Sequence, residues 1–172
     1  MSNQKRTVRK TAFIGLSVAL ALLLSYVEVL MPPLYAAVPG IKVGLPNVAV
    51  LYILYCYDTR HAALVSLTRV FLSSLLFGSV MTLAYSLAGA ILSLTVMSLL
   101  KKTDRFSAVG VSVAGGVMHN LGQVFVAMLL LDTPQIAYYM LVLSVTGTLS
   151  GIAVGLCGIL VMKRIPPRLF MK

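Results

Sequence analysis

Long apolar stretches separated by short polar segments dominate this sequence. A helix that crosses the hydrocarbon core of a bilayer needs about 20 consecutive, mostly apolar residues. Six stretches follow one another along the chain, and they predict helices at about residues 11–31, 45–57, 61–78, 81–100, 108–131 and 137–162. The second stretch is short, so it predicts a helix that is tilted or that includes part of the preceding loop. The pattern therefore predicts an all-α polytopic membrane protein with six transmembrane helices.

Residues that end helices stand between these stretches. Pro32 follows the first stretch and Pro134 follows the fifth, and proline cannot continue a helix because it lacks a backbone N–H group. Gly78 separates the third and fourth stretches, which together are about twice as long as one span. The segments between the stretches are short enough to be loops. The sequence therefore predicts one integral membrane domain over residues 1–172.

The composition agrees with a membrane protein. Hydrophobic residues make up 59% of the 172 positions, charged residues make up 10%, and the mean hydropathy is +0.98. A soluble domain of this length needs far more polar surface, so most of this chain is expected to contact lipid. Cys56 and Cys157 lie inside apolar stretches and lack the spacing of metal ligands, which predicts two small buried residues rather than a disulfide or a metal site.

The distribution of basic residues predicts the orientation. The net charge is +10, which in a soluble protein would suggest nucleic-acid binding, but here the charges lie in clusters between the apolar stretches. With the N-terminus in the cytoplasm, twelve of the fourteen Lys and Arg residues fall on the cytoplasmic side, while Lys42 falls outside and Arg69 within a span. The positive-inside rule then predicts a multi-pass protein of the bacterial cytoplasmic membrane, with both termini in the cytoplasm and no nucleic-acid partner.

Small residues recur at four-residue spacing in several of the predicted helices, most clearly in the sixth and the first. Gly147, Gly151 and Gly155 form a glycine stripe on one face of the sixth helix, and such a stripe permits a neighbouring helix to approach closely. We expect this stripe to pack inside the protein. Gly15 and Ala19 have the same spacing in the first helix. For that pair, internal packing and docking of a partner membrane protein are equal alternatives.

Polar side chains inside the apolar stretches are the candidate functional groups, because such groups are costly in lipid. Arg69 lies about eight residues into the third stretch. His119, Asn120 and Gln123 lie near the middle of the fifth, at spacings of three and four residues that place them on one helix face. Under the predicted topology both helices run outward, so Arg69, His119 and Gln123 are expected between the membrane centre and the outer leaflet.

Further polar residues are predicted nearer the outer surface. Glu28, Lys42 and Asn47 cluster there, which predicts a cavity that is open to the outside and contains Arg69. Arginine offers a forked pair of donors to a carboxylate or a phosphate, so the cavity is expected to bind a compound with an anionic group. The alternative is structural: Arg69 pairs with Glu28, and the polar face of the fifth helix only links helices. Tyr35 belongs to a predicted outer belt of tyrosines, or else stacks on the ligand.

The sequence does not predict an enzyme. Its four acidic residues are isolated, so they cannot form the paired carboxylates that hold Mg²⁺ in phosphoryl or diphosphate chemistry. It also lacks a glycine-rich nucleotide loop of the Walker type. His61 and His119 are expected at different depths, which argues against a shared haem. We expect no metal and no cofactor.

Two motifs resemble a known family. The run Pro-Gly-Ile-Lys-Val-Gly-Leu-Pro-Asn at 39–47 and the run His-Asn-Leu-Gly-Gln at 119–123, together with Arg69 and Gly78, are similar to the Gx transporter family. Its members are often labelled heptaprenyl diphosphate synthase component I. The resemblance extends from the first helix to the sixth, with Pro46 standing where a small residue such as alanine is typical. A prenyl-transferring enzyme requires an aspartate-rich diphosphate site, which this sequence lacks.

That family in turn resembles the substrate-binding membrane subunits, or S components, of energy-coupling factor transporters. The resemblance implies a compact bundle of six helices that binds a vitamin-like compound from outside and docks on a coupling transmembrane subunit and two ATPases. It implies that Ala12, Gly15 and Ala19 contact the coupling subunit, and that the loop at 34–46 closes over the ligand. ATP-driven changes in the partners would then rotate the subunit in the membrane and present its site inward.

The expected substrate is a small vitamin-like, flavin or quinone- or isoprenoid-related compound, and an anionic group on it would suit Arg69. The residues predicted to bind it are Lys42, Asn47, Arg69, His119, Asn120, Gln123, Glu28 and Tyr35. An alternative function is a membrane subunit of an assembly for flavin- or quinone-linked electron transfer or for isoprenoid metabolism.

Overall fold

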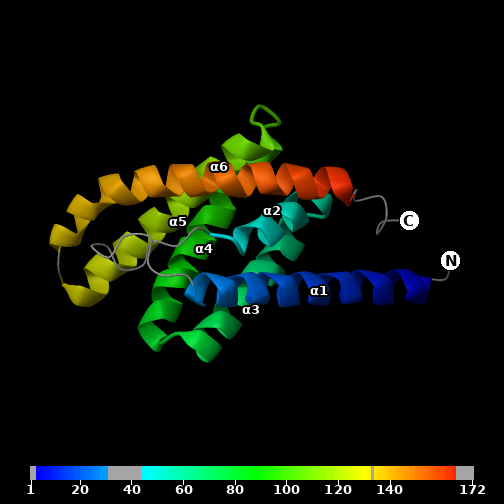
Figure 1. The fold of residues 1–172 in the computed structure, drawn as a ribbon, viewed down its shortest axis with the longest axis horizontal. Helices are drawn as coiled ribbons and strands as arrows, with labels where there is room; N and C mark the ends of the chain where they lie inside the picture. Colours follow the sequence, from blue (N-terminus) through cyan, green and yellow to red (C-terminus); the bar gives the residue numbers. More distant parts are fainter. Residues whose placement is uncertain (1–2, 31–43, 133, 166–172) are drawn as a thin grey trace.

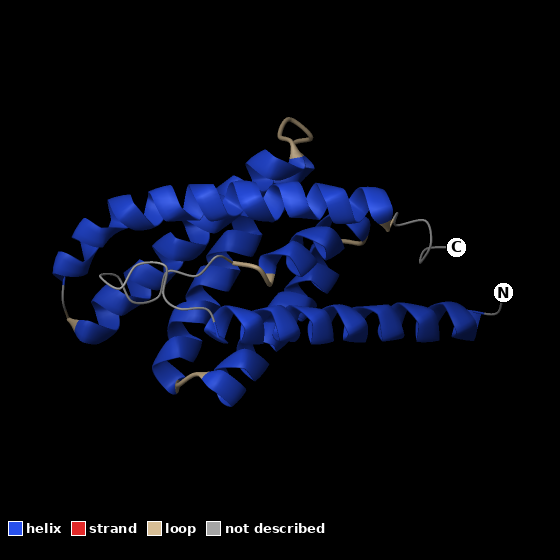
Figure 2. Ribbon diagram, viewed as in Figure 1, coloured by secondary structure: helices blue, strands red, loops and turns tan. Residues whose placement is uncertain are grey.

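Helices make up the part of the chain that the structure describes. The computed structural model describes residues 3–30, 44–132 and 134–165, and within these residues there is no β-strand (Figures 1 and 2). The helices are α1 (Asn3–Leu30), α2 (Asn47–Cys56), α3 (Thr59–Phe77), α4 (Val80–Lys102), α5 (Ala108–Leu131), the short 3-10 helix η1 (Pro134–Tyr139) and α6 (Met140–Arg164). The prediction of an all-helical protein is confirmed for these residues.

The helix boundaries differ from the predicted ones mainly at two ends. Helix α1 begins at Asn3 and so continues through the basic segment before the apolar stretch, because helical geometry does not require apolar side chains. At the other end of the chain, residues 134–139 form η1, and α6 begins only at Met140. The tighter 3-10 winding follows Pro134, whose missing N–H group is tolerated in a first turn.

Four of the described helical segments are long and apolar enough to cross a membrane. They are Thr7–Leu30, Val80–Lys102, Ala108–Leu131 and Ala137–Arg164, and they indicate a membrane protein. Helix α2 has only 10 residues. Helix α3 is long enough, but Arg60, His61 and Arg69 make it less apolar than the other four. Six spans with cytoplasmic termini therefore stay a prediction. The N-terminal end of α1 and the C-terminal end of α6 lie on the same side of the molecule (Figure 1).

Glycines set the close packing of α5 on its two neighbours. A Cβ atom added to Gly151 of α6 would lie 2.6 Å from the Cα atom of Val113 in α5, and one added to Gly155 would lie 2.8 Å from the Cα atom of Val109. On the other side of α5, a Cβ atom on Gly122 would lie 2.8 Å from the carbonyl oxygen of Ala88 in α4. The prediction that the glycine stripe of the sixth helix packs within the protein is thus confirmed.

Helix α2 forms the centre of the apolar core. Leu51, Ile53 and Leu54 are fully buried, and α2 contacts α1, α3 and α6. Cys56 is buried in the same core, as predicted. Cys157, by contrast, is exposed on α6, so the prediction of a second buried cysteine is wrong. The apolar stretch that contains Cys157 has apolar residues on every helix face. The sequence therefore did not reveal which face of α6 points away from the core.

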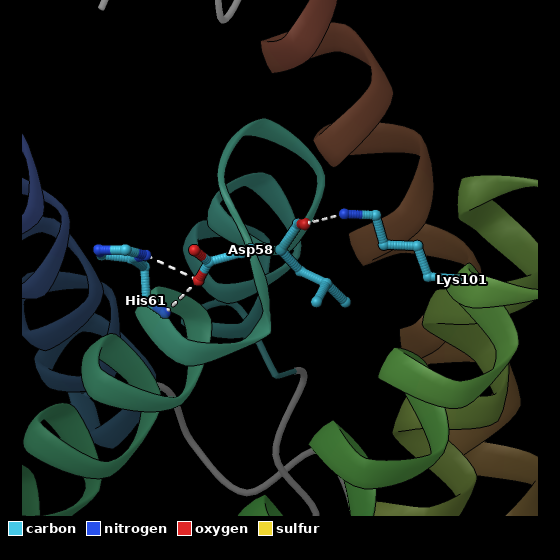
Figure 3. A network of polar contacts seen from close by, with 4 residues as sticks. Asp58, His61 and Lys101 are labelled. Atoms are coloured by element: carbon cyan, nitrogen blue, oxygen red, sulfur yellow. Dashed lines mark hydrogen bonds and ion pairs between the residues drawn. The ribbon is translucent and has the colours of Figure 1, made fainter. Parts of the chain in front are cut away.

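Polar contacts join the ends of α2, α3 and α4 (Figure 3). The carboxylate of Asp58 accepts a hydrogen bond from the backbone N–H group of His61 at 2.8 Å and contacts the Nδ1 atom of the same histidine at 2.7 Å. Asp58 is therefore the N-cap of α3. At the end of α2, the Lys101 ammonium donates to the carbonyl oxygen of Leu54 and lies 5.3 Å from the ring centre of Tyr55.

We expect the Asp58→Asn variant to be less stable than the wild type at pH 7, with a difference that shrinks as the pH falls below about 4. Partial burial raises the pKa of the Asp58 carboxyl, but the hydrogen bonds and charge of His61 outweigh this and hold the pKa below its usual value. A lowered folded-state pKa stabilises the fold above the unfolded pKa of about 3.9, and the stabilisation is lost as the pH falls through the folded pKa. Asparagine keeps the cap acceptor and removes the charge. Thermal unfolding in detergent across this pH range measures the difference, and a constant difference at every pH would contradict the assignment.

Candidate functional site

A polar cavity lies at the end of the bundle where α1 ends and α2 begins. It has a volume of about 70 Å³, and residues from all six of the described α-helices line it. Under the predicted topology this end faces the outside. The structure brings together six of the residues predicted from the sequence: Glu28, Asn47, Arg69, His119, Asn120 and Gln123. Lys42 and Tyr35, also predicted, lie outside the described residues.

Arg69 is the cation of this cavity. It belongs to α3, and although it carries a charge it is only 9% exposed. Its Nη2 group donates to the Oδ1 atom of Asn47 at 3.1 Å. Its Nε–H group is buried and has no hydrogen-bond partner among the described residues. A buried donor without a partner costs about 1–3 kcal/mol, so this N–H group is available to bind a ligand in the cavity.

A tight turn before α2 positions Asn47. Gly44 adopts a φ of +76°, a left-handed conformation that glycine adopts without strain. Its carbonyl oxygen accepts a hydrogen bond from the N–H group of Asn47 at 2.9 Å, and its own N–H group donates to the carboxylate of Glu28. This turn therefore links the end of α1 to the start of α2, and it places the Asn47 amide against Arg69.

The polar face of α5 has a structural role as well as a place in the cavity. The Asn120 amide donates to the carbonyl oxygen of Leu143 in α6 at 2.6 Å. For Asn120, this contact directly supports the alternative that the polar face of the fifth helix links helices rather than binding a ligand. His119 and Gln123 pack on Gly89 of α4, where an added Cβ atom would lie 2.7 Å from the His119 carbonyl oxygen and 3.0 Å from the Gln123 Cγ atom.

Six hydroxyl side chains complete the polar lining, and none was predicted from the sequence. They are Ser25, Ser73, Ser74, Thr82, Ser86 and Ser150. A signal was present for two of them, because Ser73 follows Arg69 by four residues and Ser25 precedes Glu28 by three, which are spacings of one helix face. The Ser25 hydroxyl donates to the carbonyl oxygen of Ala21 at 2.9 Å, which leaves its oxygen available as an acceptor.

The small residues predicted for partner docking lie on an open face of α1. Ala12, Gly15 and Ala19 are all exposed. A Cβ atom added to Gly15 would meet no atom within 4 Å, in contrast to the glycines of α6. Of the two alternatives for this face, the described residues therefore favour contact with lipid or a partner over packing within the chain.

A family profile matches most of this chain. The sequence profile of the family described as heptaprenyl diphosphate synthase component I matches residues 17–161. The matched range contains every described residue that lines the cavity, whereas Ala12 and Gly15 precede it. No curated protein and no solved structure matched the chain. The family description names one component of a larger assembly and suggests an isoprenoid-related membrane protein.

Proposed function

The chain belongs to the heptaprenyl diphosphate synthase component I family, and we propose that it is the substrate-binding membrane subunit, or S component, of an energy-coupling factor type importer. Its substrate is a small compound with an anionic group, which enters the cavity from outside the cell. The chain itself binds and presents the compound, and two partner ATPases supply the energy through a coupling transmembrane subunit.

The observation that carries this proposal is that Arg69 is buried and has an unused hydrogen-bond donor. A guanidinium that is 9% exposed, with an Nε–H group unpartnered among the described residues, lines a cavity of polar side chains. Ionisable groups at membrane depth are costly and mark substrate paths in membrane proteins. A carboxylate or phosphate of a ligand satisfies the unused donor through a charge-assisted hydrogen bond.

The presence of a single carboxylate in the described lining of the cavity supports binding rather than prenyl transfer. Diphosphate chemistry uses Mg²⁺ that several carboxylates hold, whereas the described lining contains one carboxylate, that of Glu28. Within the described residues no three His, Cys, Asp or Glu side chains gather as metal ligands. We therefore propose that this chain does not itself catalyse the reaction that the family description names.

The open face of α1 supports docking on a partner. Ala12, Gly15 and Ala19 are exposed, and small residues permit the close helix–helix approach on which association in membranes depends. The family description favours a second candidate, a membrane subunit of an assembly for isoprenoid metabolism. The two candidates differ in the partner that α1 contacts.

Co-expression of the tagged full chain with a coupling subunit and two ATPases of an energy-coupling factor transporter tests the proposal. We expect a complex that survives purification in mild detergent, and we expect Gly15→Leu to disrupt it because the larger side chain blocks the face of α1. Cys157→Leu, a change at an exposed position of α6, is the matched control and should retain the complex. Co-purification with a prenyl-transferring subunit instead of the ATPases would establish the second candidate.

A further inference from the structure

The end of the molecule away from the cavity carries exposed basic side chains that the proposed function does not use. Lys10 lies near the start of α1, and Lys163 and Arg164 lie in the last turn of α6. These three residues are exposed, and together they are named the basic site. The two helix ends lie on the same side of the molecule, whereas the loop between α4 and α5, with the exposed Lys102 and Arg105, lies apart from them (Figure 1).

Aromatic contacts of α2 join the two sides of the basic site. The Lys10 ammonium lies 5.9 Å from the ring centre of Tyr57, which follows α2. The ring of Phe13 in α1 lies 5.6 Å from that of Tyr57 and 6.1 Å from that of Tyr52, centre to centre. The Tyr52 hydroxyl donates to the carbonyl oxygen of Ile165, at the end of α6, at 2.8 Å. The ends of α1 and α6 are therefore fixed on either side of the same aromatic rings.

The excess positive charge of this end is set by residues that the structure describes. The sequence has four acidic residues, and all four belong to the described part of the chain. Two of them, Asp58 and Asp104, lie at this end, and Asp58 contacts His61. The residues that are not described include basic side chains but no acidic one, so they cannot neutralise the basic site.

The length of α1 places this end at the headgroups of a bilayer. Its 28 residues extend about 42 Å, whereas the hydrocarbon core is about 30 Å thick. Residues 11–30 suffice to cross the core, so the basic segment 3–10 extends beyond it. Leu16 of α1 and Leu160 of α6 are exposed on the core side of the basic site. A phospholipid places phosphate beside the cations and acyl chains beside these leucines, whereas an acidic protein surface matches only the cations.

We propose that the basic site binds the headgroup of an anionic phospholipid, with its phosphate oxygens on Lys10 of α1 and on Lys163 and Arg164 of α6. Lysine and arginine donate charge-assisted hydrogen bonds to phosphate, and the fork of an arginine matches two phosphate oxygens. A zwitterionic headgroup binds more weakly, because its own cation would lie among the basic side chains. The site lies away from the cavity, so the inference depends neither on the ligand of the cavity nor on the ATPases.

Titration of the purified full chain in mild detergent with phospholipid tests the proposal. The probes are dioleoylphosphatidylglycerol and dioleoylphosphatidylcholine in mixed micelles, with bound lipid counted by native mass spectrometry. We expect the phosphatidylglycerol to bind at least about tenfold more tightly. A basic residue at an anionic lipid surface contributes about fivefold to binding, so Lys10→Gln combined with Arg164→Gln should weaken it about 20- to 30-fold.

Two matched pairs of substitutions serve as controls. Lys102→Gln combined with Arg105→Gln removes the same charge outside the basic site and should weaken binding less than about threefold. Lys10→Arg combined with Arg164→Lys keeps the charge and should retain binding. Without added lipid, all three double variants should melt at the temperature of the wild type, because the substituted side chains are exposed.

Four outcomes would overturn the proposal. Equal affinity for phosphatidylcholine, or equal losses in the two neutralised pairs, would show only a general attraction to lipid. Displacement of the lipid by an equal concentration of glycerol 3-phosphate would identify a site for soluble phosphate compounds. Loss of coupling-subunit binding in the Lys10 and Arg164 variant, with phosphatidylglycerol binding retained, would assign the basic site to an acidic protein surface.

Discussion

Arg69→Met is expected to remove ligand binding and to lower the melting temperature of the protein. The guanidinium is buried, and within the described residues it makes one hydrogen bond, to Asn47. The substitution also removes the cation that acts on Glu28 and the donor of the Asn47 Oδ1 atom, and removing one partner of a buried charged pair is destabilising. Loss of one partner of a buried charged pair costs about 2–5 kcal/mol of binding, which corresponds to about 30-fold to several-thousand-fold weaker affinity.

Mass spectrometry of the small molecules released from the purified protein measures the loss. A compound found with the wild type should be absent from Arg69→Met and present with Arg60→Met, the control at an exposed position of the same helix. Arg69→Lys should retain part of the affinity, because lysine keeps the charge without the fork of donors. Retained ligand with a melting temperature several degrees lower would assign Arg69 only to holding Asn47 and α2 in place.

Gly116→Ala and Gly151→Ala are expected to destabilise the packing of α5 on α6 strongly. A Cβ atom on Gly116 would lie 2.4 Å from the carbonyl oxygen of Gly147, and one on Gly151 would lie 2.6 Å from the Cα atom of Val113. Both contacts are with backbone, so the helices themselves must separate. Overpacking of this kind costs about 1–3 kcal/mol or more, and each kcal/mol lowers the melting temperature of a protein of this size by about 2–4 °C.

Two further glycines provide matched controls. Gly110 lies on the same helix as Gly116, and the nearest atom to its added Cβ is the Ser107 Oγ atom at 3.6 Å, an ordinary contact distance. Gly15 meets no atom within 4 Å. Gly110→Ala and Gly15→Ala should therefore leave the melting temperature unchanged or raise it, since alanine favours helix by about 1 kcal/mol over glycine. Equal losses for all four variants would show that the close approach of α5 and α6 is not what these glycines provide.

Much of the helical pattern could be predicted from the sequence because the requirement is local. A span needs a long apolar stretch, and the residues that end helices stand at the ends of those stretches. Arg69 and the polar face of α5 were found for the same reason, since charged and amide groups stand out among apolar neighbours. The cavity hydroxyls were missed because serine in a helix can bond to the carbonyl of its own preceding turn, as Ser25 does with Ala21, and so leaves no conflict to detect.

The sequence by itself determined the helices, the small-residue stripe of α6 and the polar residues that are candidate binding groups. Only the tertiary structure decided their partners. The stripe packs on α5, while Gly15 on α1 meets no atom of the described chain. Arg69 is hydrogen-bonded to Asn47, and Asn120 is hydrogen-bonded to Leu143 of the neighbouring helix α6. Such contacts join residues that are 22 or 23 positions apart, and a periodic pattern specifies which face of a helix is polar but not which helix will stand opposite it.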